Sequence, residues 1–194
     1  MSYLALDQSK SRTGWAAWQP GWEKPVFGSV QLGSQYTSRG QTFTKLRSTI
    51  IDVWSTVTHF EYLFFEEPIN HMMKGGTSEE AILLSLGMAG CIEGVGHELR
   101  CRRVMKLSSS SWRPGFCGND EISMIKRAAK AAQRSARDPL KAASMARCQQ
   151  LGLKPGNDDE ADAIGILTYG ILSNGETPAW LRGEVLRQPL EVAR

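Results

Sequence analysis

Short apolar runs separated by turn residues open the chain and predict a β-sheet. Residues 2–6, 14–18 and 26–32 are runs of strand length, and polar turns containing Gly, Ser and Pro separate them. Because these connections are short, the three strands are expected to form an antiparallel meander. Further apolar runs at 62–65 and 101–107 predict a fourth and a fifth strand.

Elsewhere the apolar positions recur every three or four residues, which predicts helices. The predicted helices cover residues 37–60, 77–95, 120–137, 138–151 and 157–173. Capping residues mark three of these starts, at 77–80, at Asp138 and at Asn157. Residues 108–118 are expected to be a loop.

The order of the elements predicts an α/β fold. Three hairpin-connected strands precede helices that alternate with two more strands, which indicates a five-stranded mixed sheet flanked by helices. The antiparallel strands come first and the parallel strands follow, with the first and fourth strands side by side. Two full domains would be cramped in 194 residues. We therefore expect a single domain over residues 1–175 and a C-terminal tail over 176–194.

Composition narrows the class of protein. An apolar fraction of 41% and a charged fraction of 22% are typical of soluble globular proteins, and no apolar run approaches the roughly 18 residues of a membrane span. No basic segment of a signal peptide precedes Asp7. The four cysteines form no C-x-x-C pair and are expected to be reduced, and the three histidines are not spaced as zinc ligands. A cytoplasmic protein is expected.

Positive charge is concentrated in one stretch of the chain. Residues 100–150 carry twelve Lys and Arg against three Asp and Glu, a net charge of +9, so the rest carries −6 of the total +3. A basic block on an acidic body is typical of proteins that bind a polyanion, although a solvated helix face has the same composition. Four of its cations follow helical spacing and are expected on one face: Lys126, Lys130, Arg134 and Arg137.

Six acids from three distant segments are expected to meet at one edge of the sheet. Open α/β sheets bind their ligands at the carboxyl ends of neighbouring strands. The acids are Asp7 after the first strand, Glu66 and Glu67 after the fourth, and Asp158, Asp159 and Asp162 in the first two turns of the last helix. Within that helix, Asp162 shares a face with Asp158 or with Asp159.

Such a cluster predicts a metal site. Close carboxylates cannot all ionise without cations, because each raises the pKa of the others. Mg²⁺ takes oxygen ligands of this kind, and two ions roughly 4 Å apart promote in-line cleavage of a phosphodiester. Removing one charge, by Asp7→Asn or Asp162→Asn, is therefore expected to stabilise the metal-free protein.

Most of these acids also have a structural explanation. Asp7 could begin a polar turn, and Glu67 could be a solvated strand end. Asp158 and Asp159 suit a helix N-terminus through capping and the helix dipole. Asp162 differs, because it lies five residues into the helix among apolar neighbours, beyond the reach of capping.

Several segments, in order, resemble the RuvC-type Holliday-junction resolvases of the RNase H-like superfamily, with phage-type members the most similar. They are Leu4-Ala5-Leu6-Asp7 with Thr13-Gly14-Trp15, then Phe64-Phe65-Glu66, then 104–118 with Trp112-Arg113, and Asn157-Asp158-Asp159-Glu160-Ala161-Asp162. The resemblance spans about residues 3–172.

The resemblance implies an RNase H-like nuclease domain that resolves four-way or branched DNA junctions by two-metal hydrolysis. By position, the catalytic and metal-binding acids are Asp7, Glu66, Asp159 and Asp162. The expected cofactor is Mg²⁺ (or Mn²⁺), two ions per site, with no organic cofactor. A homodimer is expected, in the cytoplasm of a bacterium or of a phage-infected host. The expected phosphate contacts are Arg113, Lys126, Lys130, Arg134, Arg137 and Lys141, the last matching a basic helix position of the family.

Some positions depart from the family, and other functions stay open. Gln8-Ser9 follows the first acid where the family often has Pro-Gly, and Ile69 stands where some members have an aromatic wedge. Base unstacking would then fall to another residue of 69–73. The alternatives are a nuclease for RNA–DNA hybrids, a nucleic-acid-binding protein with structural acids, and an actin-like nucleotide binder, for which the chain is short.

Overall fold

A five-stranded mixed sheet forms the centre of the structure, a computed structural model in which residues 1–68 and 78–185 are described. The strand order is β3-β2-β1-β4-β5; β1, β2 and β3 pair antiparallel, and β4 joins β1 and β5 in parallel. The strands are β1 (Tyr3–Asp7), β2 (Thr13–Trp18), β3 (Val26–Val30), β4 (Tyr62–Glu66) and β5 (Arg103–Leu107). The sheet predicted from the sequence is confirmed, including the parallel pairing of the first and fourth strands.

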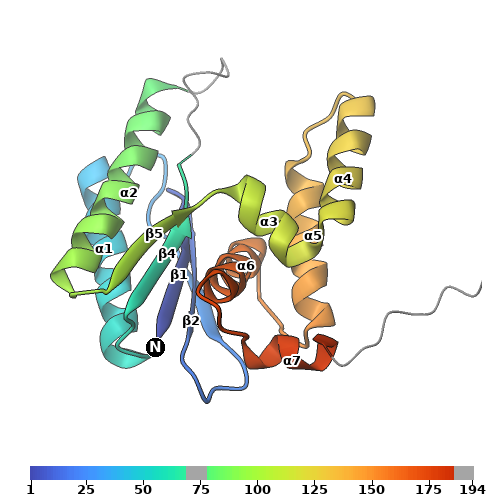
Figure 1. Cartoon of the computed structure of the whole chain (residues 1–194). Coiled ribbons are helices and arrows are strands. Elements are labelled where there is room, and N and C mark those ends of the chain that lie inside the picture. Colours follow the sequence, from blue (N-terminus) through green and yellow to red (C-terminus); the bar gives the residue numbers. More distant parts are fainter. Residues whose placement is uncertain (69–77, 186–194) are drawn as a thin grey trace, which may run out of the picture.

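Helices cover both faces of this sheet (Figure 1). They are α1 (Arg39–Thr56), α2 (Glu79–Glu98), α3 (Ser109–Cys117), α4 (Asn119–Ala131), α5 (Arg137–Gln150), α6 (Asp158–Ser173) and α7 (Ala179–Val185). α1 and α2 pack on one face, and α6 lies along the other. α3 and α5 pack on the outside of α6, and α4 packs on both of them. Over residues 1–68 and 78–185, no helix is both long and apolar enough to cross a membrane.

The segment predicted as a loop at 108–118 is a helix, α3. Ser108 caps it by accepting a hydrogen bond from the Ser110 amide at 3.3 Å. Trp112 and Phe116, one turn apart, are both buried against the core. The sequence prediction was wrong because a run of serines and an internal proline favour turns when no tertiary contact is known.

The helix predicted at 120–137 is too long. α4 ends at Ala131, and Gln133 then adopts a left-handed backbone conformation with φ of 52°. α5 begins with Ala136 at its N-cap, so Asp138 lies in the first turn and does not cap the helix. Because cationic residues continue at helical spacing from α4 into α5, the sequence pattern gave no sign of this break.

The expected C-terminal tail begins with packed structure. Trp180 of α7 is buried edge-on against Trp18, with ring centroids 5.7 Å apart, and its indole donates to the Thr168 hydroxyl at 3.2 Å. The Tyr3 hydroxyl donates to the Glu176 carboxylate at 2.8 Å. Packing on the domain therefore continues past residue 175, the expected boundary.

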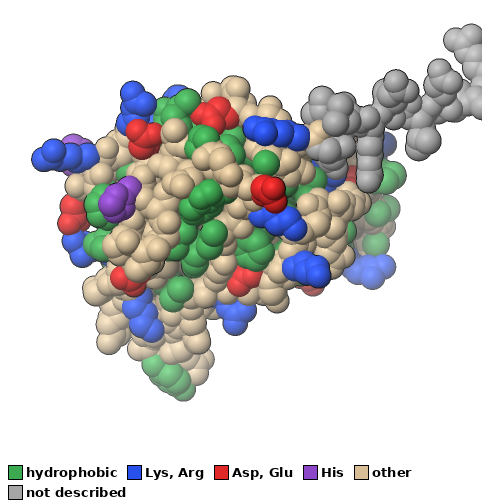
Figure 2. Space-filling model, turned by 90° about the horizontal axis from the view of Figure 1, so that it is seen from below, with side chains coloured by type: hydrophobic (Ala, Val, Ile, Leu, Met, Phe, Trp, Pro, Cys, Tyr) green, Lys and Arg blue, Asp and Glu red, His purple; other side chains and the backbone are tan. Residues whose placement is uncertain are grey.

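The two ends of the sheet differ in what they present. Figure 2 shows the end at which β1 begins, opposite the carboxyl ends of β1 and β4. Acidic, basic and apolar side chains are interspersed there, and neither sign of charge forms a continuous patch. The concentrated acidic residues lie at the other end, described next.

Candidate active site

Strand alternation turns Asp7 and Glu66 to the same face of the sheet. Successive side chains of a strand point to opposite faces. Tyr3 belongs to the apolar cluster beneath α6, so Asp7, four residues on, faces α6 as well. The parallel register pairs Leu6 with Phe65, which places Glu66 beside Asp7 at the next position. The two carboxyl groups are close enough for a hydrogen bond.

Glu66 reaches this site, whereas Glu67 does not. The indole nitrogen of Trp112 donates to Glu66 Oε1 at 3.1 Å. The Gln8 amide donates to the backbone oxygen of Glu66 at 2.6 Å. Glu67, one residue further, lies 3.7 Å from the ammonium of Lys106, and both side chains are exposed.

A close contact between β2 and α6 brings the remaining acids to Asp7. Gly14 is the antiparallel partner of Asp7, and a Cβ atom at Gly14 would lie only 2.0 Å from the backbone oxygen of Asp159. A residue without a side chain is therefore required there. α6 is capped as predicted, because the Asn157 side chain accepts a hydrogen bond from the Glu160 amide at 3.1 Å.

Burial raises the pKa of three acids, and repulsion from neighbouring carboxylates adds to it for Asp7 and Glu66. For Asp7, desolvation is the largest cause, and the carboxylates of Glu66, Asp162 and Asp159 add to it, so its pKa lies well above 3.8. Desolvation also raises the pKa of Glu66 and of Asp162, against the opposing charge of Arg113. Carboxyl groups from β1, β4 and α6 thus interact at one place, as the sequence predicted.

Arg113 of α3 binds Asp162. Its two terminal nitrogens each donate to one carboxylate oxygen, both at 2.9 Å. The two side chains are only 11% and 2% exposed. The same guanidinium donates to the Ser144 hydroxyl at 3.1 Å and stacks 4.3 Å from the ring centroid of Trp112. Such a bidentate pair is strong, because the guanidinium fork matches the carboxylate.

Lys141 of α5 binds Asp158 and Asp159 of α6. Its ammonium donates to the Asp158 carboxylate and lies 3.4 Å from that of Asp159. Desolvation acts to raise the pKa of Asp158, but the hydrogen bond and charge of Lys141 outweigh it, and the pKa of Asp158 is lowered. Lys141 therefore lies at the acids that begin α6.

The donor chemistry of the site suits a hard divalent cation, since every candidate ligand is a carboxylate oxygen. Burial, with added repulsion from neighbouring carboxylates, raises the pKa values of Asp7 and Glu66, so a bound cation would favour their ionised forms. Yet among residues 1–68 and 78–185, no three Asp, Glu, His or Cys side chains are placed to surround one ion. Arg113 holds both oxygens of Asp162, and Lys141 holds Asp159.

The other predicted phosphate contacts lie apart from these acids in the sequence and do not share one helix face. Lys126 and Lys130 are exposed on α4, Arg134 is exposed in the connection to α5, and Arg137 opens α5. Arg113 does not belong to this exposed group, because its guanidinium is buried on Asp162. The predicted wedge segment, 69–73, lies outside the described residues.

Sequence reasoning missed the groups that hold the acids in place. Trp112 and Arg113 are adjacent on α3, yet one binds Glu66 of β4 and the other binds Asp162 of α6. Ser144 and Gln8 complete these contacts. Trp112 was noted only as part of a family resemblance and Arg113 was predicted to contact phosphate. Their acidic partners, 46 and 49 residues away, leave no local pattern.

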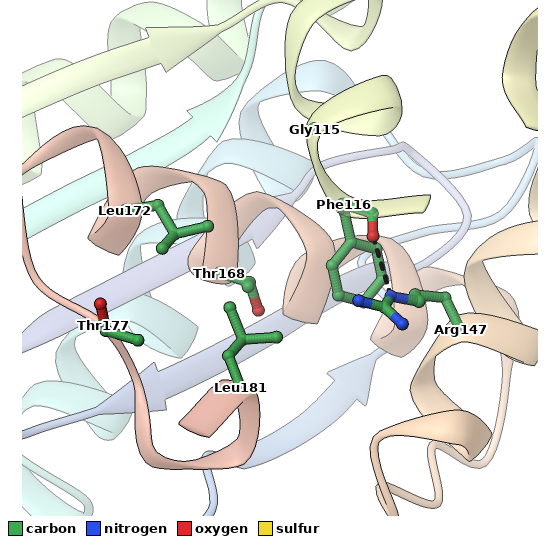
Figure 3. Close-up of a pocket in the computed structure, with 7 residues that line it drawn as sticks. All are labelled: Gly115, Phe116, Arg147, Thr168, Leu172, Thr177 and Leu181. Atoms are coloured by element: carbon green, nitrogen blue, oxygen red, sulfur yellow. Dashed lines mark hydrogen bonds between the residues drawn. The ribbon is translucent and has the colours of Figure 1, made fainter. Parts of the chain in front are cut away.

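A small pocket of about 210 Å³ lies elsewhere, between α3, α5, α6 and α7 (Figure 3). Thr168 and Leu172 line it from the last turns of α6, whereas the acids occupy the first turns. Arg147 closes one side, and its Nε donates to the Phe116 carbonyl oxygen at 3.0 Å. No candidate catalytic acid lines this pocket, so it is separate from the acid cluster.

Solved structures share this arrangement of strands and helices. Two structures of RuvC from Thermus thermophilus match at 14% sequence identity and cover 90% of this chain. The TM-score is 0.58 over 97% of one RuvC chain, and 0.57 over 96% of the other, which is in complex with a Holliday junction substrate. No protein-family model and no curated protein sequence matches the chain. The chain has a RuvC-like, RNase H-like fold; the closer likeness to phage-type members stays a prediction.

Proposed function

We propose that this protein is a metal-dependent, structure-selective DNA endonuclease that resolves four-way or branched DNA junctions. The observation that carries the proposal is the meeting of Asp7, Glu66 and Asp162, from three separate elements, at the carboxyl edge of a RuvC-like sheet. Repulsion between acids kept this close opposes folding, although Arg113 offsets it at Asp162. Binding of divalent cations explains why they are together.

Asp7, Glu66, Asp159 and Asp162 would hold two Mg²⁺ or Mn²⁺ ions. When bound, such ions supply an activated water and stabilise the leaving 3′-oxygen. The protein's own groups fix the ligands: Trp112 orients the Glu66 carboxylate, and the β2–α6 contact at Gly14 holds the backbone of Asp159 beside Asp7. Lys141, already at the acids, would place a non-bridging phosphate oxygen next to them.

The substrate is proposed to be branched DNA. A matching RuvC structure contains a Holliday junction substrate, and this chain carries a net charge of +9 over residues 100–150. Lys126, Lys130, Arg134 and Arg137 are exposed on or next to α4 and α5, the helices beside the acid-bearing α6. Contacts from such cations to phosphates position DNA without reading its sequence.

We further propose that the protein acts as a homodimer. A four-way junction presents two equivalent strands related by a two-fold axis, which a symmetric dimer matches. Helix α2 offers an exposed face for the purpose. Leu83 and Leu86 are 45% and 54% exposed on it, and the open space at Gly90 and Gly94 on the same helix would let a partner helix approach.

A comparison of substrates tests the proposed function. Purified protein with Mg²⁺ is incubated with a four-way junction, a linear duplex of the same sequence and an RNA–DNA hybrid. The expected result is cleavage of the junction in preference to both controls, abolished by chelation and by Asp7→Asn. Preferential cleavage of the hybrid would assign the same acids to a ribonuclease, and cleavage of none would leave a binding protein.

A further inference from the structure

Arg113 joins three helices at the acid cluster. From α3 it donates to both oxygens of Asp162 on α6, to the Ser144 hydroxyl of α5 and, at 3.5 Å, to the Leu140 carbonyl oxygen. Its guanidinium also stacks on Trp112. Asp162 is thus provided with a cation by the protein itself, in a place where the side chain is 2% exposed.

A guanidinium and a divalent cation compete for such a carboxylate. Both are positive, and at hydrogen-bond distance in a poorly solvated site like charges repel strongly. Asp7 and Glu66, by contrast, receive no ion pair from any described Lys or Arg within 4.0 Å. The protein's own cations therefore pair with the acids of α6, whereas Asp7 and Glu66 are left without a cationic partner.

We propose that Arg113 is the resident counter-cation of Asp162 in the metal-free protein, and that divalent ions complete their binding only by displacing its guanidinium from Asp162. Arg113 is then a positioning residue that sets the metal concentration at which the site assembles. The proposal rests on the proposed metal-dependent function and names a residue that controls it.

The surroundings of Arg113 allow the exchange without leaving its charge unpartnered. If the guanidinium leaves the carboxylate, the Trp112 ring and the Leu140 carbonyl oxygen remain beside it. Trp112 is fixed independently by its hydrogen bond to Glu66 and by complete burial. The guanidinium of Arg113 can therefore move while the Trp112 ring stays in place.

Metal binding without DNA or activity tests the proposal. Mn²⁺ is titrated calorimetrically into the wild-type protein, Arg113→Gln, and the control Arg127→Gln, which removes an exposed charge of α4. Loss of the competing cation is expected to tighten Mn²⁺ binding by on the order of tenfold in Arg113→Gln and to leave it unchanged in Arg127→Gln. In the double variant Arg113→Gln with Asp162→Asn, the tighter Mn²⁺ binding is expected to disappear, because the carboxylate for which Arg113 and the metal ion compete is absent.

Equal or weaker Mn²⁺ binding by folded Arg113→Gln would overturn the proposal and leave the metal-dependent function standing. Absence of binding by every protein would overturn the metal-dependent function as well. Because Arg113→Gln removes the partner of a buried acid, Arg113→Lys is a second variant that retains the positive charge. Its affinity for Mn²⁺ is expected to lie between those of the wild type and Arg113→Gln. In the wild type, the guanidinium ¹⁵N resonances of Arg113 are expected to shift on addition of Mg²⁺, and unchanged resonances would also contradict displacement.

Discussion

Glu66 ends β4 and Glu67 follows it, and the different partners of these adjacent residues show how single residues define the acid cluster. Glu66 accepts a hydrogen bond from buried Trp112, whereas Glu67 faces exposed Lys106. The sequence could not separate them by alternation, because a parallel strand buried on both faces is apolar at every position. Strand position and family resemblance favoured Glu66, and the structure places Glu66 with Asp7.

Glu66→Gln and Glu67→Gln are therefore expected to differ sharply. Glu66→Gln removes a charge from the acid cluster and should lower junction cleavage by at least about 100-fold, the order found when a group that acts on the reacting atoms is lost. Glu67→Gln only loses an exposed ion pair and should stay within about twofold of wild type. Cleavage rates at saturating Mg²⁺ measure both. Similar losses in the two variants would show that Glu66 has no special role.

Asp162 illustrates how a tertiary partner reverses an expectation drawn from sequence. Charge repulsion alone predicted that Asp162→Asn stabilises the metal-free protein. Arg113, however, pairs with both oxygens of Asp162, so removing that acid leaves a buried guanidinium without its main partner. Asp162→Asn is now expected to be destabilising in chelator. Asp7, which has no ion pair with a described Lys or Arg, keeps the original expectation.

For Asp7 the sign of the pH dependence can be worked out. Its pKa is raised in the folded protein, so between about 3.8 and that higher value the folded state binds more protons than the unfolded state. The contribution of Asp7 to stability is present below this window and is lost as the pH rises through it. In chelator, Asp7→Asn should therefore be more stable than wild type and melt at a higher temperature at pH 7, with little difference near pH 4. A constant difference across this range would argue against a raised pKa.

Elements with a regular apolar period or a capping residue were predicted well, and elements defined by tertiary contact were not. The five strands and α6 follow from period and from the Asn157 cap. Helix α3 was not predicted, because its serines and Pro114 favour a turn. It forms because Trp112 and Phe116 pack into the core. The break between α4 and α5 carries no Pro or Gly and so gave no signal.

The contact between β2 and α6 predicts the effect of one added methyl group. Gly14→Ala would place a Cβ atom 2.0 Å from the Asp159 backbone oxygen, so α6 must shift away from Asp7. The expected loss of stability is about 1–3 kcal/mol, together with weaker Mn²⁺ binding. Gly40→Ala is the matched control, since a Cβ there would meet no atom within 4 Å beyond the local backbone of α1. It should not destabilise the protein, and at most it should gain about 0.4–1 kcal/mol. Thermal melts and calorimetry give the comparison, and equal behaviour of the two variants would contradict a tight β2–α6 contact.

At the scale of the whole molecule, exposed cations and exposed leucines occur on both helical layers. Lys126, Lys130 and Arg137 are exposed on α4 and α5 outside α6, whereas Leu83 and Leu86, the two most exposed leucines of the described residues, lie on α2 across the sheet. A family resemblance in four short segments predicted this fold from the sequence, and the RuvC structures share it. Which surface meets DNA and which meets a second copy depends on side chains whose exposure no sequence pattern reveals.

The proposed dimer predicts that a charge on α2 separates the subunits. Leu86→Arg places a cation on a side chain that is 54% exposed, so the fold should be unaffected while dimerisation is lost. Met124→Arg, at a 64% exposed position on α4, is the matched control and should stay dimeric. Sedimentation velocity at micromolar concentration distinguishes the two. A wild-type protein that is monomeric at this concentration and still cuts both strands together would remove the need for a dimer.

The most direct measurement of catalysis by the acid cluster separates binding from cleavage on one substrate. A labelled four-way junction is incubated with wild-type protein and with Asp7→Asn, in Ca²⁺ for binding and in Mg²⁺ for cleavage. Asp7→Asn is expected to bind the junction within a few-fold of wild type, because the exposed cations of α4 and α5 are unchanged, yet to lose paired cleavage of opposing strands. Cleavage by Asp7→Asn at the wild-type rate, or wild-type protein that binds junctions and never cuts them in Mg²⁺ or Mn²⁺, would contradict a nuclease centred on Asp7, Glu66 and Asp162.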